Sequence, residues 1–305
     1  MKKLISLLSL SLLMVACNEG YSIKQAANVT GGAGGGGGPI TCPAEYVKIP
    51  FNSAVGTTKD FCVAKYEMKN VSGAAVSQIS STPWGSITAT NAMTACQVIG
   101  PGYDLISNAE WMTIARNVEN VNTNWSSNTV GTGELSMGSY SFCDANHVYT
   151  DYSCGPASTN FQYKRTFDLS NGELIWDFAG NFNEWVDWEV ETPTNTFTLA
   201  HTIACPHGYH QVNDVSTLCP SVLPASKVSS SDTGLTSTNG IGQINLGYST
   251  GGTGGTSGGG GGPGAVFRSG GGSGGVMGGA FTTDFGYDQN STNFNLGFRC
   301  VYRGN

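Results

Sequence analysis

Nine cysteines are the strongest constraint on what this chain of 305 residues can fold into. None of them forms a Cys-x-x-Cys pair, which argues against a thiolate zinc site or a redox motif. A cysteine-rich chain is typical of an oxidising compartment, where disulfides form and persist. The cysteines therefore predict an exported protein whose fold is braced covalently.

The N-terminus agrees with export. Lys2 and Lys3 precede an apolar run of 13 residues, Leu4–Ala16, which is shorter than the roughly 20 residues that a membrane span requires. This pattern is typical of a secretory signal peptide. The small residues before Cys17 resemble the bacterial lipobox, which implies cleavage before Cys17 and its lipidation. An ordinary signal peptide with a coincidental cysteine is the alternative.

Reserving Cys17 for lipid leaves eight cysteines, an even number that allows complete pairing. Two pairs would close short loops and one would flank the first strand pair, which leaves one long-range bridge. The predicted disulfides are Cys143–Cys154, Cys205–Cys219, Cys42–Cys62 and Cys96–Cys300.

Charge and composition exclude several classes of protein. The formal net charge is −7 and no basic block follows the N-terminus, so nucleic acid is not an expected partner. The sequence has no heptad repeat, which excludes a coiled coil, and no second apolar span, which excludes a polytopic membrane protein. Glycine is clustered, and residues 31–38 are typical of a flexible tether.

The remaining sequence predicts an α+β fold with a high content of irregular structure. Residues 61–66 are expected to form a strand, and residues 88–99 a helix with one apolar face. Ser107 and Glu110 match a capping box at the start of a second helix. Asn171-Gly172 indicates a hairpin, and residues 297–302 close the chain as an extended segment.

Five blocks, in order, resemble the formylglycine-generating (sulfatase-modifying) enzyme family. They are Phe61–Met68, Gly102–Trp111, Ile175–Trp185, Arg268–Ser273 and Gly297–Cys300. The resemblance implies a C-type-lectin-like variant fold over about residues 42–303. In that fold an early-helix cysteine often bridges to the last strand, in agreement with Cys96–Cys300.

The resemblance also implies a calcium site in the third block, with side chains at its ends and carbonyls between. The expected ligands are Asp177, Gly180, Phe182 and Glu184, which supply the hard oxygen donors that calcium requires. A structural turn is the alternative, with Glu184 capping backbone amides.

Two further groups of residues could bind ligands. His201, His207 and His210 surround Cys205, although a surface loop closed by Cys205–Cys219 explains them better than a metal site. Trp176, Trp185 and Trp188 could stack on sugars, but core packing is the more common role of such residues.

The function expected is that of a lipoprotein at the bacterial outer membrane or cell surface, anchored to the membrane by lipid. Residues 1–16 would be the signal peptide and residues 17–40 the lipid-attachment cysteine and tether. Residues 41–305 would be a non-catalytic ligand-binding or adhesive domain, whose partner would be an extracellular protein or glycan. Its binding surface would be the loops at 120–165, 189–240 and 250–280.

A copper-dependent formylglycine-generating oxidase is the alternative, and a structural envelope protein is a second. The resemblance implies two copper-binding cysteines shortly before the terminal block, yet Phe267–Arg299 contains no cysteine. Soft thiolates are what select Cu(I), so the domain is not expected to be an enzyme of that family.

Overall fold

The computed structural model describes residues 40–138, 161, 164–190, 209–211, 243–245, 264–269 and 278–304. Within these ranges the chain forms two α-helices, two short 3₁₀ helices and fourteen strands. No helix among the described residues is long and apolar enough to cross a membrane. The signal peptide, Cys17 and the tether lie outside the described residues.

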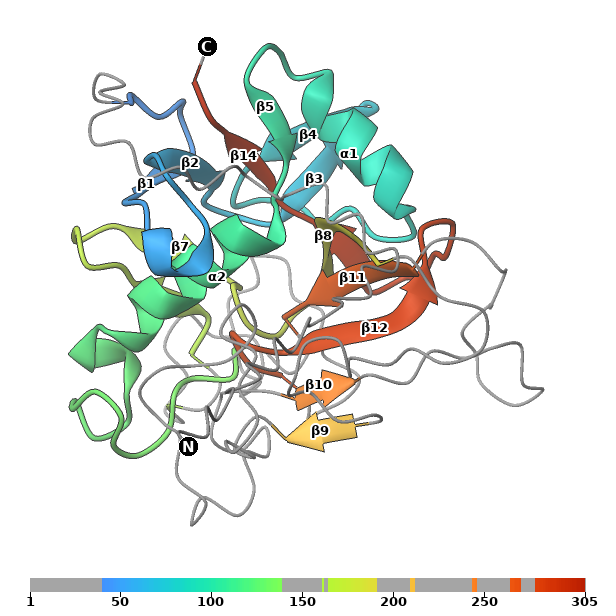
Figure 1. The fold of residues 1–305 in the computed structure, drawn as a ribbon. Helices are drawn as coiled ribbons and strands as arrows, with labels where there is room; N and C mark the ends of the chain where they lie inside the picture. The colour runs from blue at the N-terminus through green and yellow to red at the C-terminus, as the bar shows by residue number, and fades with distance from the viewer. Residues whose placement is uncertain are drawn as a thin grey trace, which may run out of the picture.

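Two sheets of different character form the centre of the molecule (Figure 1). The first is antiparallel, and the second is mixed because two of its strand pairs are parallel. The first contains, in spatial order, β1 (Tyr46–Ile49), β2 (Phe61–Ala64), β14 (Cys300–Tyr302) and β5 (Tyr103–Leu105). The second contains β13 (Leu296–Phe298), β8 (Asn183–Val190), β11 (Gly264–Arg268), β12 (Thr283–Asp288), β10 (Gln243–Asn245) and β9 (Tyr209–Gln211).

Two hairpins and the helices complete the described fold. The hairpins are β3 (Met68–Val71) with β4 (Ala74–Ser77), and β6 (Thr166–Asp168) with β7 (Leu174–Trp176). The helices are α1 (Ala89–Gln97) and α2 (Asn108–Glu119), and the 3₁₀ helices are η1 (Ser53–Val55) and η2 (Asn122–Asn124). The mixture of helices and largely antiparallel sheets confirms the α+β class.

Helix α2 begins where the capping box predicted. The Ser107 hydroxyl accepts from the Glu110 amide at 3.3 Å, and the Ser107 amide donates to Glu110 Oε2 at 2.8 Å. These two bonds satisfy donors that the first turn of a helix leaves free. Four apolar side chains of this helix are fully buried: Trp111, Ile114, Ala115 and Val118.

Helix α1 is shorter than the sequence predicted. It ends at Gln97, so Ile99 lies beyond it and is 37% exposed rather than part of a buried face. Cys96 is buried and bonded to Cys300 of β14. The disulfide therefore ties α1 to the first sheet.

The two faces of the strands support separate parts of the core. Val186 of β8 and Val266 of β11 pack in the cluster that contains the apolar face of α2. Their neighbours Trp185 and Phe267 point the other way, into the cluster that contains α1. This alternation follows from the two-residue period of a β-strand. Strand β8 therefore contributes to both hydrophobic clusters, and the residues at its start lie between them.

The second disulfide within the described residues joins Cys42 to Cys62, with their Cα atoms 5.5 Å apart. It holds the segment before β1 against β2. Both predicted pairings that fall in the described chain are thus present. The predicted pairs Cys143–Cys154 and Cys205–Cys219 lie outside it, as do His201 and His207.

Candidate functional site

Six buried ionisable residues gather where β3, β7, β8 and the end of β13 meet. We call this group the buried charge cluster. It consists of Glu67, Lys69, Arg165, Asp177, Glu184 and Arg299, each of which is at most 2% exposed. Three of these side chains are basic and three are acidic.

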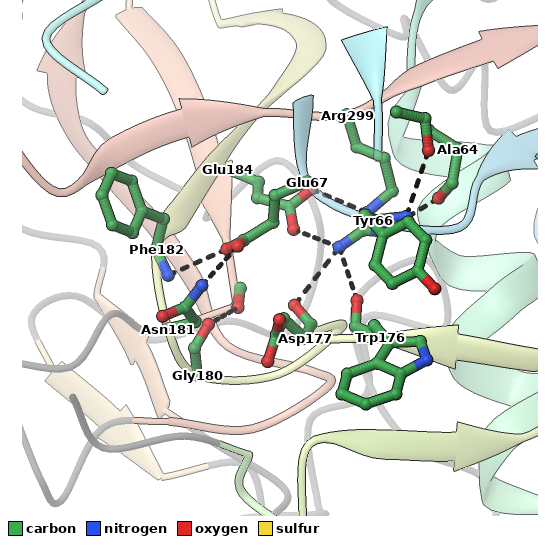
Figure 2. A network of polar contacts seen from close by, with 12 residues as sticks. Ala64, Tyr66, Glu67, Trp176, Asp177, Gly180, Asn181, Phe182, Glu184 and Arg299 are labelled. Atoms are coloured by element: carbon green, nitrogen blue, oxygen red, sulfur yellow. Dashed lines mark hydrogen bonds and ion pairs between the residues drawn. The ribbon is translucent and has the colours of Figure 1, made fainter. Parts of the chain in front are cut away.

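Arg299 lies at the centre of the cluster and pairs with Glu184 (Figure 2). Its Nη2 and Nε donate to the two Glu184 oxygens at 2.8 and 3.1 Å. The remaining donors reach backbone oxygens of Ala64 and Trp176, each at 2.9 Å. Arg299 lies between β13 and β14, and its guanidinium therefore links this point to β2, β7 and β8. Bidentate guanidinium–carboxylate pairs of this kind are strong and directional.

Arg165 and Asp177 form a second bidentate pair. Arg165 Nε donates to Asp177 Oδ1 at 2.6 Å, and its Nη2 donates to Oδ2 at 2.5 Å. The guanidinium also lies 5.7 Å from the centre of the Trp176 ring, within the range of a cation–π contact. Both carboxylates that were expected to end the calcium-binding segment are thus engaged by arginine.

Among the residues that the structure describes, no arginine donates a hydrogen bond to Glu67. Its carboxyl group accepts hydrogen bonds from the Asn181 side-chain amide and, at 3.0 Å, from the Phe182 backbone amide. Burial, reinforced by the negative charge of Asp177, raises the pKa of Glu67 to about 8. Burial likewise lowers the pKa of the Lys69 ammonium. The low-dielectric interior disfavours the charged form of each group.

The backbone between the two pairs adopts an unusual conformation. Asp177 and Asn181 have positive φ angles of 52° and 58°, which side-chain-bearing residues adopt at some energetic cost. Gly180 is fixed by two hydrogen bonds with Ser269: its amide donates to the Ser269 carbonyl at 3.2 Å, and its own carbonyl accepts from the Ser269 hydroxyl at 2.9 Å. The surrounding structure therefore holds this turn in one conformation.

The two carboxylates of the expected calcium site are paired with arginines in this arrangement. Asp177 and Glu184 direct their oxygens at guanidinium groups, and the Phe182 amide faces Glu67. Among the described residues no group of three or more His, Cys, Asp or Glu side chains could hold a metal ion. Calcium binding remains a prediction without structural support.

The tryptophans expected as possible sugar platforms have different environments. Trp185 is fully buried and its indole donates to the Ile87 carbonyl at 2.9 Å, which identifies it as a core residue. Trp176 is partly exposed and lies 5.9 Å from the Tyr66 ring. The side chain of Trp188 lies outside what the structure describes.

One sequence pattern could have indicated the buried charged residues that the sequence analysis did not identify. Arg299 stands between Phe298 and Cys300 as a single charge inside an apolar segment, whereas Glu67 has Lys65 and Lys69 two positions away on either side. A charged residue at such a position is buried only when it is paired. The pattern thus indicates that partners exist, although it cannot name them.

Chemically, the cluster is suited to holding the fold together. Two carboxylates are neutralised by two arginines, and the third lies beside Lys69 with a pKa high enough to keep it largely protonated near neutral pH. Every member is buried, so none is presented to a substrate in solution.

Comparisons with known proteins do not assign the chain to a family. No family model matches it, and no curated protein does either. Among solved structures, the chain is similar to "Treponema denticola variable protein 1", with 12% sequence identity and a TM-score of 0.36. The similarity covers 85% of this chain and 92% of that one.

Proposed function

We propose that the protein is a lipid-anchored bacterial envelope protein whose residues 41–305 form a non-catalytic ligand-binding domain with a C-type-lectin-like variant fold. Its partner would be an extracellular protein or glycan. The observation that carries this proposal is the buried charge cluster. Its ionisable groups are paired with one another and are inaccessible to a substrate, which suits a rigid scaffold better than a reaction centre.

Rigidity has a functional value in this proposal. Binding loops on a fixed scaffold lose less conformational freedom when they engage a partner, and such loops commonly carry recognition. Two disulfides and two bidentate ion pairs brace the described part of the fold. Of the loops expected to bind, the structure describes only parts, including residues 120–138 and 264–269.

The lipid anchor can be tested separately from binding. Full-length protein expressed in bacteria with a labelled fatty acid should incorporate the label and fractionate with membranes. Cys17→Ser should lose both properties, because the preceding apolar run is too short to span a bilayer. Asn18→Ser is the matched control and should behave like the wild type. An unlabelled wild-type protein would contradict the anchor.

Binding can be tested with an array of glycans and extracellular proteins probed with the full-length protein. We expect saturable binding to a small set of related ligands. The enzyme alternative is tested by incubating the protein with copper, oxygen and a sulfatase-type cysteine peptide. A mass loss at the peptide cysteine that depends on this protein would overturn the non-catalytic proposal.

A further inference from the structure

Arg268 is a third buried arginine, outside the buried charge cluster, and its environment is different. It is the last residue of β11 and is fully buried. Its Nε and Nη2 both donate to one acceptor, Asn108 Oδ1, with Nε at 3.0 Å. Its Nη1 is buried and has no hydrogen-bond partner among the residues that the structure describes.

The positive charge of Arg268 also has no acidic partner in the described chain. Arg165 and Arg299 each pair with a carboxylate. Glu184 lies opposite Arg268 in the β11–β8 pair, but both of its oxygens accept from Arg299. Burial without a counter-charge lowers the pKa of Arg268 to about 9.

An uncompensated buried charge costs several kcal/mol. A neutral acceptor, such as the Asn108 amide oxygen or a water molecule, satisfies an N–H group but leaves the charge without a partner. An anion would satisfy both Nη1 and the charge. The comparison with Arg165 and Arg299 therefore points to an anionic partner that the described side chains do not supply.

The neighbouring helix adds positive potential at the same place. Asn108, which holds the Arg268 guanidinium, is the first residue of α2, a helix of 12 residues. The N-terminus of a helix carries a partial positive charge, and anions bind there readily. The Glu110 carboxylate offsets part of this potential, because it caps the same turn and pairs with Arg303 at 2.7 Å, so the attraction for an anion beside Nη1 comes mainly from the Arg268 guanidinium.

We propose that Arg268, together with the N-terminus of α2, binds a small monovalent anion of the halide or carboxylate type. Because Arg268 is fully buried, the anion must be small, with only a few atoms. The backbone carbonyl of Ser269, the next residue, accepts a hydrogen bond from the Gly279 amide at 3.1 Å. The anion would therefore stabilise the end of β11 and its contact with Gly279. This role is independent of the proposed function.

The test measures thermal unfolding of the full-length protein in sodium chloride and in sodium isethionate at equal ionic strength. Isethionate is a monovalent anion too large for a buried site. We expect the Tm to rise by about 5 °C as chloride reaches about 100 times its dissociation constant, and to stay constant in isethionate. Equal Tm values in the two salts at every concentration would exclude a halide at this site, and the same result with sodium formate in place of chloride would overturn the proposal.

Two variants separate a specific site from a general salt effect. Arg268→Met should abolish the chloride dependence. Lys48→Met removes the same charge from the surface, where Lys48 pairs with Asp60 at 2.9 Å, and should keep the dependence. A chloride dependence that survives in Arg268→Met would also overturn the proposal.

A measurement on the wild type covers the case in which Arg268→Met does not fold. Binding should broaden the ³⁵Cl NMR line, and bromide should reverse the broadening by competition. Absence of specific broadening would contradict a halide site unless formate raises the Tm instead, which would assign the site to carboxylates. If neither anion has an effect, the proposal fails.

Discussion

Arg299→Met removes five hydrogen bonds from the centre of the buried charge cluster. Methionine can occupy much of the same volume, but it leaves the Glu184 carboxylate buried without a counter-charge. Removing one partner of a buried ion pair costs about 3–5 kcal/mol. At about 2–4 °C per kcal/mol for a domain of this size, the Tm should fall by roughly 6–20 °C.

The assay is urea unfolding followed by tryptophan fluorescence, for the wild type, Arg299→Met, Glu184→Leu and the double variant. The double variant removes both charges, so it should be more stable than the sum of the two single losses predicts. Each single variant leaves one buried charge alone, whereas the double variant leaves neither. Arg299→Met and the double variant both lose the Arg299 hydrogen bonds to the backbone carbonyls of Ala64, Trp176 and Asp177.

The loss in Arg299→Met should also depend on pH. Burial already raises the pKa of Glu184, and removing Arg299 should raise it further. An acid with a raised pKa in the folded state is tolerated at low pH, where it is neutral, and costs stability as the pH rises. The loss should therefore be smaller at pH 5 than at pH 8. A loss below about 1 kcal/mol, or strictly additive single losses, would refute the reasoning.

Four other outcomes are expected. The pKa of Glu67 is about 8 in the folded protein, above its ordinary value of 4.5. Its contribution to stability should therefore be greatest below pH 4.5. Between pH 4.5 and about pH 8 this contribution should fall by up to about 1.4 kcal/mol per pH unit. Glu67→Gln should remove this part of the pH profile measured by urea unfolding, and an unchanged profile would contradict the assignment. Gly138→Ala should prevent normal folding, seen as loss of the cooperative thermal transition, because φ is +77° there and a Cβ would lie 1.5 Å from the Ala179 carbonyl oxygen; wild-type stability would show that this contact is wrong. Reduction of the Cys96–Cys300 disulfide, or its replacement by two serines, should cost up to about 5 kcal/mol, because it closes a loop spanning 204 residues, and peptide mapping without reduction should recover this pair. Chelation by EDTA should leave the Tm unchanged because arginine pairs with both expected ligand carboxylates, and a marked fall would support the calcium prediction.

The sequence by itself determined the features that depend on neighbours along the chain. The capping box at Ser107 and Glu110 starts α2 because both partners are three residues apart. Asn171-Gly172 lies between β6 and β7, where Gly172 has a φ of +82°. Such signals can be recognised from sequence because their physical cause lies within a few residues.

Only the tertiary structure decided which partners the buried charges have. Arg299 and Glu184 are 115 positions apart, and no periodicity or spacing relates them. The sequence indicated oxygen ligands at Asp177 and Glu184, but carboxylates that could bind calcium could equally bind arginine. The packing of strands from distant parts of the chain brought a guanidinium to each of these two carboxylates, and among the described residues it gave Arg268 only Asn108 as a hydrogen-bond partner. Coulomb interactions depend on distance in space, which the order of residues does not determine.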